Sequence, residues 1–435
     1  MTPLGRTEPD RCPGVLAVHE AADGGLARVR LPGGVLSAQQ LRVLAAAAVE
    51  LGDGHLELTS RANVQIRALR PGAPVELSER LYAAGLLPSI SHERVRNILA
   101  SPLSGLDTHG RYDVLPLARD LDRLLCARPA LAELPGRFLF ALDDGRGDLA
   151  SAKADVAVRM VDSQLAELLL AGAPTGVLLP PEQAPDLMVA AAEAFLAERA
   201  QQQSEAWRLA ELLNGPQRVL ARLGLQEQAA LQHVPGEHLA AGAGTAQAVE
   251  ACEGGPALEG EGRVPRAAVP RAGWVQDGVG VGAFVVGVPL GVLDGEQAAV
   301  IAGVAGGWES LGASEAVLRV TRGRGVVVVG VAEEDLTQLA GCGLVVEAES
   351  AWNGVTSCAG RPGCGKALGD VRGDARRVVP GWSGGQKAVH WSGCERRCGK
   401  PGGEFVDVVA LASGGYSVDG VAMTVDEVGD GVRVQ

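Results

Sequence analysis

Four cysteines near the C-terminal end of the chain have the residue type and spacing of a metal centre. They form two pairs, Cys358 with Cys364 and Cys394 with Cys398, spaced C-x5-C and C-x3-C on turns rich in Gly and Pro. Such turns expose backbone N–H groups that can donate to cluster sulfur, so the pattern favours an iron–sulfur cluster. Structural zinc is the alternative, although its ligand pairs usually lie about two to four residues apart. Coincidence is the third interpretation.

The remaining cysteines are isolated in the sequence: Cys12, Cys126, Cys252 and Cys342. A disulfide framework is disfavoured because a chain of this length does not need such cross-links and a reducing compartment does not keep them. The first residues carry charges before any apolar stretch, so no secretory signal is expected. We therefore predict a cytoplasmic protein.

Charge and hydropathy exclude two classes of partner. The chain has 435 residues and a formal net charge of −13, which gives no overall basic field for nucleic acid or anionic lipid. Its longest uncharged stretches, residues 168–181 and 278–293, are shorter than the roughly 20 residues needed to cross a bilayer.

Only four of the 39 basic residues are Lys, which leaves 35 arginines. Either a GC-rich genome or a need for bidentate carboxylate binding explains this bias.

An internal repeat indicates which elements position these residues. Residues 31–36 (LPGGVL) are echoed by residues 288–293 (VPLGVL), and each copy precedes a helix-capping residue, Ser37 or Asp294, and an apolar helical stretch. Short strands are expected downstream at 55–59 and 64–66, and again at 316–321 and 326–329. The sequence therefore predicts two β-α-β-β units that pair about a pseudo-two-fold axis.

Other segments predict a second α/β region and a C-terminal region. Helical periodicity covers 115–125, 187–199 and 204–223, and strands are expected at 138–142 and 156–161. Residues 226–273 are rich in Ala, Gly, Glu and Gln without periodicity, which is typical of a linker. Short strands are expected at 404–411 and 423–434.

The duplicated unit followed by the two cysteine pairs resembles the nitrite/sulfite reductase family over nearly the whole chain outside the linker. The resemblance implies an α+β fold with two ferredoxin-like half domains and two α/β domains that support the cluster and a tetrapyrrole. The implied divisions are 1–80 (first half domain), 81–225 (first α/β domain), 226–273 (linker), 274–345 (second half domain) and 346–435 (cluster domain). It also implies that Cys358, Cys364, Cys394 and Cys398 hold a [4Fe-4S] cluster, with Cys398 the potential bridge to sirohaem iron.

Three arginines match basic positions of the family. Arg30 in RVRLPGG and Arg96 in RNIL resemble arginines on the substrate side, and Arg61 in LTSRANVQ resembles one that binds tetrapyrrole carboxylates. The resemblance therefore implies substrate binding by Arg30, Arg61 and Arg96, and catalytic roles for Arg30, Arg96 and Arg137.

One departure from the family pattern bears on the reaction. The reductases carry a Lys-Phe-Lys pattern after Leu-Pro, whereas residues 134–139 (LPGRFL) keep one cation, Arg137, and place Leu139 at the second position. Multi-electron reduction of a small oxyanion needs dense positive charge and proton delivery, so the loss of a cation argues against it. Residues 134–145 (LPGRFLFALDDG) resemble instead the precorrin-3B synthases, a branch that hydroxylates precorrin-3A with dioxygen in aerobic cobalamin biosynthesis.

This resemblance implies an iron–sulfur monooxygenase with a [4Fe-4S] cluster and a mononuclear non-haem iron, whose ligands the sequence does not identify. His19, His55, His92, His109 and His390 are candidates only as histidines. Precorrin-3A and dioxygen are the expected substrates. A ferredoxin or an NAD(P)H-linked reductase is the expected electron donor, because no dinucleotide-binding Gly-x-Gly-x-x-Gly fingerprint is present. The alternatives are a sirohaem-dependent nitrite or sulfite reductase and a non-catalytic tetrapyrrole-binding metal protein.

Overall fold

The structure is a computed structural model that describes residues 10, 12–225, 272–275, 282–309, 317–382 and 387–434. Cys252 and the expected linker 226–273 lie outside these residues, apart from positions 272 and 273. Among the described residues, no helix is both long and apolar enough to cross a membrane.

The N-terminal half repeat forms an antiparallel sheet with helices against it. Its elements are β1 (His19–Ala21), β2 (Gly24–Val29), β3 (Val35–Leu36), α1 (Ala38–Leu51), β4 (His55–Leu58), β5 (Val64–Leu69) and α2 (Ala73–Ala83). The second half repeat has the same plan, with β11 (Gly273–Trp274), β12 (Ala283–Val286), β13 (Val292–Asp294), α6 (Gly295–Glu309), β14 (Leu318–Val320), β15 (Val326–Val329) and α7 (Asp335–Gly341). The expected duplication is confirmed.

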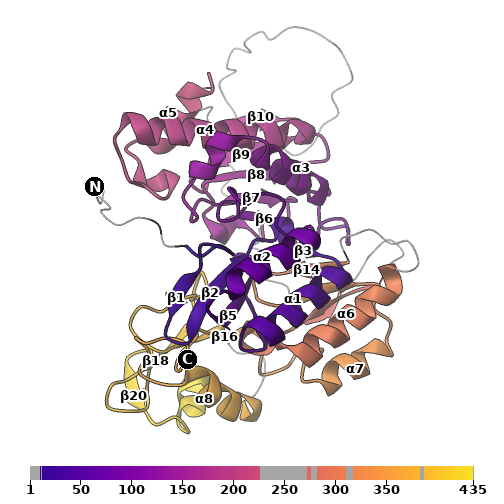
Figure 1. Ribbon diagram of the computed structural model, residues 1–435, viewed down its shortest axis with the longest axis vertical. Helices are drawn as coiled ribbons and strands as arrows, with labels where there is room; N and C mark the ends of the chain where they lie inside the picture. Colours follow the sequence, from indigo (N-terminus) through magenta and orange to yellow (C-terminus); the bar gives the residue numbers. More distant parts are fainter. Residues whose placement is uncertain are drawn as a thin grey trace, which may run out of the picture.

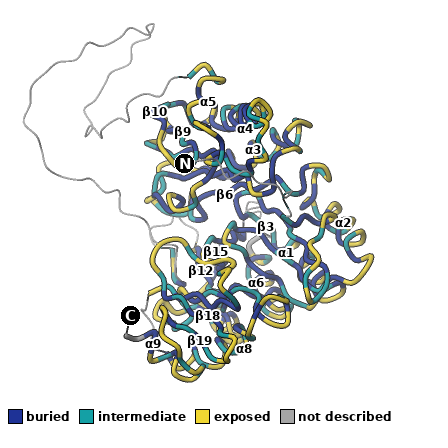
Figure 2. The backbone as a smooth tube through the Cα atoms, turned by 90° about the vertical axis from the view of Figure 1, so that its left-hand side faces the viewer, coloured by how far each residue is buried: buried dark blue, intermediate teal, exposed yellow. Residues whose placement is uncertain are grey.

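Each half repeat completes its sheet with a strand from the other. The first sheet has the order β1-β2-β5-β4-β13, and the second has the order β11-β12-β15-β14-β3. Val292 of β13 pairs with Glu57 of β4, and Leu318 of β14 pairs with Leu36 of β3. Helices α1 and α6 pack side by side, with Leu44 and Ile301 fully buried in one shared core (Figure 2). The exchange relates the two halves by the predicted pseudo-two-fold arrangement.

Both predicted helix caps are present. Ser37 Oγ accepts from the Gln40 amide at 3.0 Å, and the Gln40 side chain accepts from the Ser37 amide at 3.0 Å. Asp294 accepts from the Gln297 amide at 2.8 Å, and Gln297 accepts from the Asp294 amide at 3.1 Å. These reciprocal capping boxes satisfy N–H groups that the first turn of a helix leaves free.

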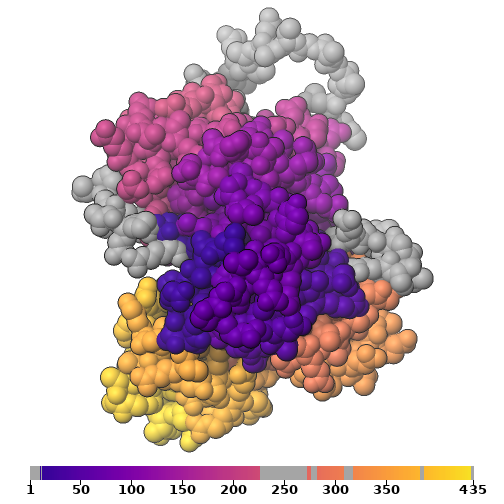
Figure 3. Space-filling model, in the orientation of Figure 1, coloured from indigo at the N-terminus to yellow at the C-terminus, as the bar shows by residue number. Residues whose placement is uncertain are grey.

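Residues 98–225 form a separate lobe above the two sheets in Figure 1, and the same lobe is the purple to pink upper part of Figure 3. Its elements are β6 (Ile98–Ala100), α3 (Leu115–Cys126), β7 (Phe140–Asp143), β8 (Val156–Met160), β9 (Ala166–Leu170), β10 (Ala173–Leu179), α4 (Ala184–Gln201) and α5 (Gly215–Arg222). Strands β6, β7 and β8 are parallel, and β9 and β10 extend the sheet in antiparallel fashion.

The C-terminal lobe repeats that strand pattern. It contains β16 (Val355–Ser357), α8 (Val371–Val378), β17 (Val389–Ser392), β18 (Val406–Ala410), β19 (Tyr416–Val418), β20 (Val421–Met423) and α9 (Val428–Val434). Strands β16, β17 and β18 are parallel, and β19 and β20 are antiparallel additions. The duplication therefore extends to the two lobes, which the sequence repeat did not reveal.

Two predicted elements are wrong. The helix expected over 204–223 exists only as α5, because Asn214 has a left-handed backbone (φ 50°) and Pro216 lies in the first turn of the helix that follows. The strand expected over 423–434 is limited to Met423, and the rest contains α9. Val428 and Val432 are both buried, and this i, i+4 spacing suits a helix face.

Candidate functional site

The four predicted cluster cysteines lie on loops at one edge of the C-terminal sheet. Cys358 follows β16 and Cys394 follows β17, and these strands are parallel neighbours with Ser357 opposite Trp391. Since the carboxyl ends of parallel strands meet at the same edge, both cysteine pairs begin side by side. The Gly393 amide donates to Cys358 Sγ at 3.1 Å, the kind of backbone contact that holds a thiolate in a cluster site.

The second member of each pair turns back toward the first. The Cys364 amide donates to the Gly360 carbonyl at 2.8 Å, and the Arg397 amide donates to the Cys394 carbonyl at 3.2 Å. Burial raises the pKa of the Cys398 thiol, Arg396 opposes this rise, and the thiols of Cys358, Cys394 and Cys364 add to it. Cys398 therefore lies within electrostatic reach of the other three cysteines.

The spacing of these thiols bears on the two metal hypotheses. Tetrahedral zinc binds thiolates at about 2.3 Å, which brings their sulfur atoms to within about 4 Å of one another. Among the described residues, no three cysteines have Sγ atoms all within 4.8 Å of one another. Thiolates on a cubane bind different iron atoms and stand further apart. The residues present fit a [4Fe-4S] cluster, by their C-x5-C and C-x3-C spacing and by the backbone donor on Cys358 Sγ.

Buried polar atoms next to these loops support this fit. Ser357 and Ser392 are the last residues of β16 and β17, and their hydroxyls are buried without a hydrogen-bond partner within the described part of the chain. Buried hydroxyls normally have a partner, and groups beside a metal centre often find it in the ligands or the cofactor.

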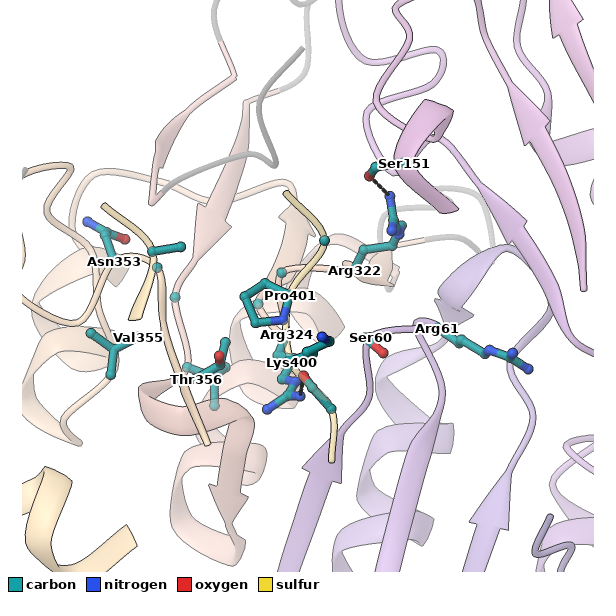
Figure 4. A pocket seen from close by; sticks show the side chains of 18 of the residues that line it. Ser60, Arg61, Ser151, Arg322, Arg324, Asn353, Val355, Thr356, Lys400 and Pro401 are labelled. Carbon is teal, nitrogen blue, oxygen red and sulfur yellow. Dashed lines mark hydrogen bonds between the residues drawn. The ribbon is translucent and has the colours of Figure 1, made fainter. Parts of the chain in front are cut away.

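A cavity of about 520 Å³ lies where the two half repeats meet the C-terminal lobe. Its size falls within the range of about 300–1,000 Å³ typical of small-molecule sites. Arg61, Arg322, Arg324 and Lys400 supply its charged lining, and no Asp or Glu is among its lining residues in the described chain. Arg324 and Lys400 lie together near Pro401, whereas Arg61 extends away from them (Figure 4). This cavity suits a ligand with several carboxylates.

Arg61 belongs to a dense group of cations. Burial, together with the charges of Arg208 and Arg28, lowers its pKa to about 10. Burial and Arg28 likewise lower the pKa of Arg30. Among the described residues Arg61 has no side-chain ion pair, so its guanidinium is free to bind an anion.

Arg30 and Arg96 are placed differently from Arg61. Arg30 is 2% exposed and donates to the carbonyls of Pro13 and Arg94, each at 3.2 Å, while its Nη1 has no partner among the described residues. Arg96 donates both Nε and Nη2 to Asp122 at 2.7 Å and Nη1 to the Leu86 carbonyl at 3.1 Å. Both line a different hollow, of about 880 Å³, and neither lines the cavity of Arg61. Their roles toward substrate remain predictions.

The segment with the missing cation borders the cavity. Leu139 lines it and is 3% exposed, so the wall is apolar where the reductase pattern places a lysine. Arg137 points elsewhere and stacks on the Trp207 ring, 4.9 Å from its centroid. The catalytic role predicted for Arg137 is not tested by this contact.

The predicted histidines do not gather into an iron site. His19 and His109 are exposed, and His55 is half-buried. His92 contacts Ser89, Ser91 and the Arg128 carbonyl. His390 is fully buried beside Thr356, and burial with the nearby Arg324 charge lowers its pKa to about 3.

Among the described residues, one group of three or more possible metal ligands has its ligand atoms within 4.8 Å of one another. It consists of the carboxylates of Asp143, Asp144 and Asp148. They already accept hydrogen bonds from Arg146, from Ser101 and from backbone amides. No histidine joins them, so the described residues do not fit a mononuclear iron site of two histidines and one carboxylate.

Sequence reasoning missed Arg322, Arg324 and Lys400. The turn 321–325 (TRGRG) is the equivalent of 59–63 (TSRAN) in the first repeat. In both turns the Thr hydroxyl accepts from the amide four residues on, at 3.1 Å. An alignment of the two repeats through these turns would have matched the arginines of the second turn to positions next to Arg61 in the first turn.

Comparisons with known proteins agree with this architecture. Residues 19–84 match the family model described as the nitrite/sulfite reductase ferredoxin-like half domain. A precorrin-3B synthase from a Sinorhizobium species is 26% identical over 425 residues, covering 94% of this chain and 83% of that protein. A ferredoxin–nitrite reductase from Synechococcus elongatus is 37% identical over 134 residues, which cover 29% of this chain and 26% of that protein.

A solved structure shares the fold. The Mycobacterium tuberculosis NirA protein superimposes with a TM-score of 0.68 at 19% identity, covering 93% of this chain and 79% of that one. Residues 19–84 are therefore similar to a nitrite/sulfite reductase ferredoxin-like half domain, and the chain as a whole is similar to a precorrin-3B synthase and shares the fold of the NirA protein.

Proposed function

We propose that this chain hydroxylates precorrin-3A with dioxygen, as an iron–sulfur monooxygenase of the precorrin-3B synthase branch. The observation that carries the proposal is the cavity beside the cysteine loops, which four cations and no carboxylate of the described chain line and which Leu139 closes with an apolar wall. The relative that spans most of the chain, a precorrin-3B synthase, supports the same branch.

The cations of the cavity would bind and orient the substrate. A precorrin carries acetate and propionate groups, and the chain is net negative, so binding needs a local cluster of positive charge. Arg61 lines the cavity from the first repeat, while Arg322 and Lys400 line it from the second repeat and the cluster loop. Carboxylates held on different sides would fix the macrocycle in one orientation.

The cysteine loops would place an electron source against this cavity. Gly399 and Lys400 line it directly after Cys398. A bound [4Fe-4S] cluster supplies single electrons, and hydroxylation consumes two electrons and two protons as one oxygen atom enters the product and the other leaves as water. The apolar wall at Leu139 would keep water from that face.

A sirohaem-dependent nitrite or sulfite reductase is the second candidate. The 37% identity to a ferredoxin–nitrite reductase over 134 residues favours it. The apolar Leu139 disfavours it, because a small anion then lacks one of its cations.

Turnover and metal content test the proposal together. Anaerobically purified protein should contain about four irons and four sulfides per chain. Its absorption spectrum should show a broad shoulder without sirohaem bands. It should convert precorrin-3A only when dioxygen and a reductant are added. Cys358→Ser should bleach the protein, whereas Cys126→Ser, on α3, should not. Sirohaem bands with nitrite or sulfite reduction at about 1–10³ per second would establish the reductase instead. Tetrapyrrole binding without turnover of any of these substrates would indicate a binding protein.

A further inference from the structure

Arg324 links the second half repeat to both pairs of cysteines. Its Nη1 donates to the Ser357 carbonyl at 2.8 Å and its Nη2 donates to the Gly399 carbonyl at 2.7 Å. Ser357 directly precedes Cys358, and Gly399 directly follows Cys398. One guanidinium therefore joins two loops through the carbonyls of residues 357 and 399, which lie 42 positions apart in the chain.

The turn that carries Arg324 does not itself require an arginine. Arg324 has a left-handed backbone with φ 64°, and its equivalent in the first repeat, Ala62, has φ 54°. Both amides close the same turn onto a Thr carbonyl, at 3.0 Å. An alanine is enough for this turn, so the arginine in the second repeat is explained by what its side chain reaches.

The charge of Arg324 is buried and unpaired. The residue is 8% exposed and has no carboxylate within 4.0 Å among the described residues. Burial, with help from Arg372, lowers its pKa to about 10, a value at which it still carries its charge near neutral pH. Burying a cation without a carboxylate is costly unless a negative group is supplied from elsewhere.

We propose that Arg324 is the positioning residue of the iron–sulfur site, which it holds by both cysteine loops and whose reduction potential its charge raises. This inference rests on the cluster of the proposed function. A [4Fe-4S] cluster with four thiolates changes from a net charge of 2− to 3− when it takes one electron from the donor. A cation beside the thiolates stabilises the more negative state and so favours reduction.

Arg319 provides a matched control. It belongs to β14 of the same repeat, is 6% exposed, and donates to two carbonyls, those of Pro102 at 2.9 Å and Ser104 at 2.7 Å. Burial lowers its pKa to about 10 as well. Its partners lie in the other lobe, away from the cysteines. Arg319→Gln thus removes a similar buried charge and similar hydrogen bonds without touching the cluster loops.

The test is a potentiometric titration of the cluster, followed by its electron paramagnetic resonance signal, in the full chain without substrate. Arg324→Gln should shift the oxidised-to-reduced ratio at fixed potential at least tenfold toward oxidised, which is about 59 mV for one electron. Arg324→Lys keeps the charge but cannot span both carbonyls, so it should shift the potential less and lose iron faster. Arg319→Gln should leave the potential unchanged.

Each possible result for the Arg324→Gln protein supports or contradicts the positioning role of Arg324. Loss of the cluster from folded Arg324→Gln, with Arg319→Gln still loaded, also supports the positioning role. A fully loaded Arg324→Gln protein with the wild-type potential would overturn the proposal. Wild-type protein without iron and sulfide would instead overturn the proposed function on which it rests.

Discussion

Two arginines at family positions differ sharply in what their side chains contact. Arg61 lines the cavity without an ion pair within the described part of the chain, whereas Arg96 is held by Asp122. Both stand in motifs of the family, LTSRANVQ and RNIL, and the motifs alone imply a similar use. The contacts predict different consequences of removing each one.

Replacement of Arg61 should weaken substrate binding. Arg61→Ala should strand a substrate carboxylate at a cost of about 2–4 kcal/mol, or roughly 30- to 1000-fold in the dissociation constant, with the cluster spectrum intact. Arg61→Lys should recover only part of the loss because an ammonium lacks the planar fork. Equilibrium binding of precorrin-3A measures this, with the exposed Arg123→Ala as control. Unchanged affinity in Arg61→Ala would remove Arg61 from the binding site.

Replacement of Arg96 should instead destabilise the fold. Arg96→Ala leaves the Asp122 carboxylate largely buried, at 16% side-chain exposure, without its partner. Breaking one side of such a pair costs about 3–5 kcal/mol. Denaturant unfolding should show this loss, and the double change Arg96→Met with Asp122→Leu should restore much of it. A stable Arg96→Ala protein with impaired turnover would favour the predicted substrate role.

Asp148 should make stability depend on pH. Burial raises the pKa of this carboxyl from 3.8 to about 7, with Asp143 contributing. Because the folded value is raised, the stability contribution is full below about pH 4 and is lost as pH rises toward and through 7. Asp148→Asn should therefore be more stable than wild type at pH 8, by about 2–4 kcal/mol, and similar at pH 4. Equal unfolding free energies at pH 8 would contradict this.

At the scale of elements, the capping boxes of α1 and α6 show what the sequence can predict. Ser37 and Asp294 are recognisable because a cap depends on residues within one turn. Ser37→Ala and Asp294→Ala should each lower the free energy of unfolding by about 0.5–2 kcal/mol, measured by denaturant titration. Ser78→Ala, on the exposed face of α2, is the control. A loss no larger than that of the control would show that these caps do not stabilise the helices.

Elements that depend on distant partners were harder to predict. The exchange of β3 and β13 involves strands of two and three residues, too short to show a pattern, and their partners lie in the other half of the chain. The segment 428–434 (VGDGVRV) alternates like a strand but folds as α9, because tertiary packing buries Val428 and Val432. Likewise, the motifs identify Arg61 but not Arg322 and Lys400. These two residues are distant from Arg61 in the sequence, and the fold brings them to the same cavity.

At the scale of the whole molecule, the two lobes use equivalent loops for different side chains. After β7 the chain places Asp144 and Asp148 with three residues between them, and after β17 it places Cys394 and Cys398 with the same spacing. In the first lobe Arg146 forms an ion pair with Asp144, and Asp148 accepts from the Ser101 hydroxyl at 2.7 Å. In the second lobe the thiols remain available, next to a cavity that both half repeats help to form. Within the described part of the chain, the duplicated lobes thus carry a carboxylate group on one side and the four clustered cysteines on the other.

The origin of the oxygen atom tests the central claim most directly. We predict that incubation of the full chain with precorrin-3A, a reductant and isotopically labelled dioxygen places one labelled atom in the product, detected by mass spectrometry, and that no product forms without dioxygen. The Cys398→Ser protein under the same conditions is the control for electron supply and should give no labelled product. Label arriving from water, or full conversion in the absence of dioxygen, would contradict the account.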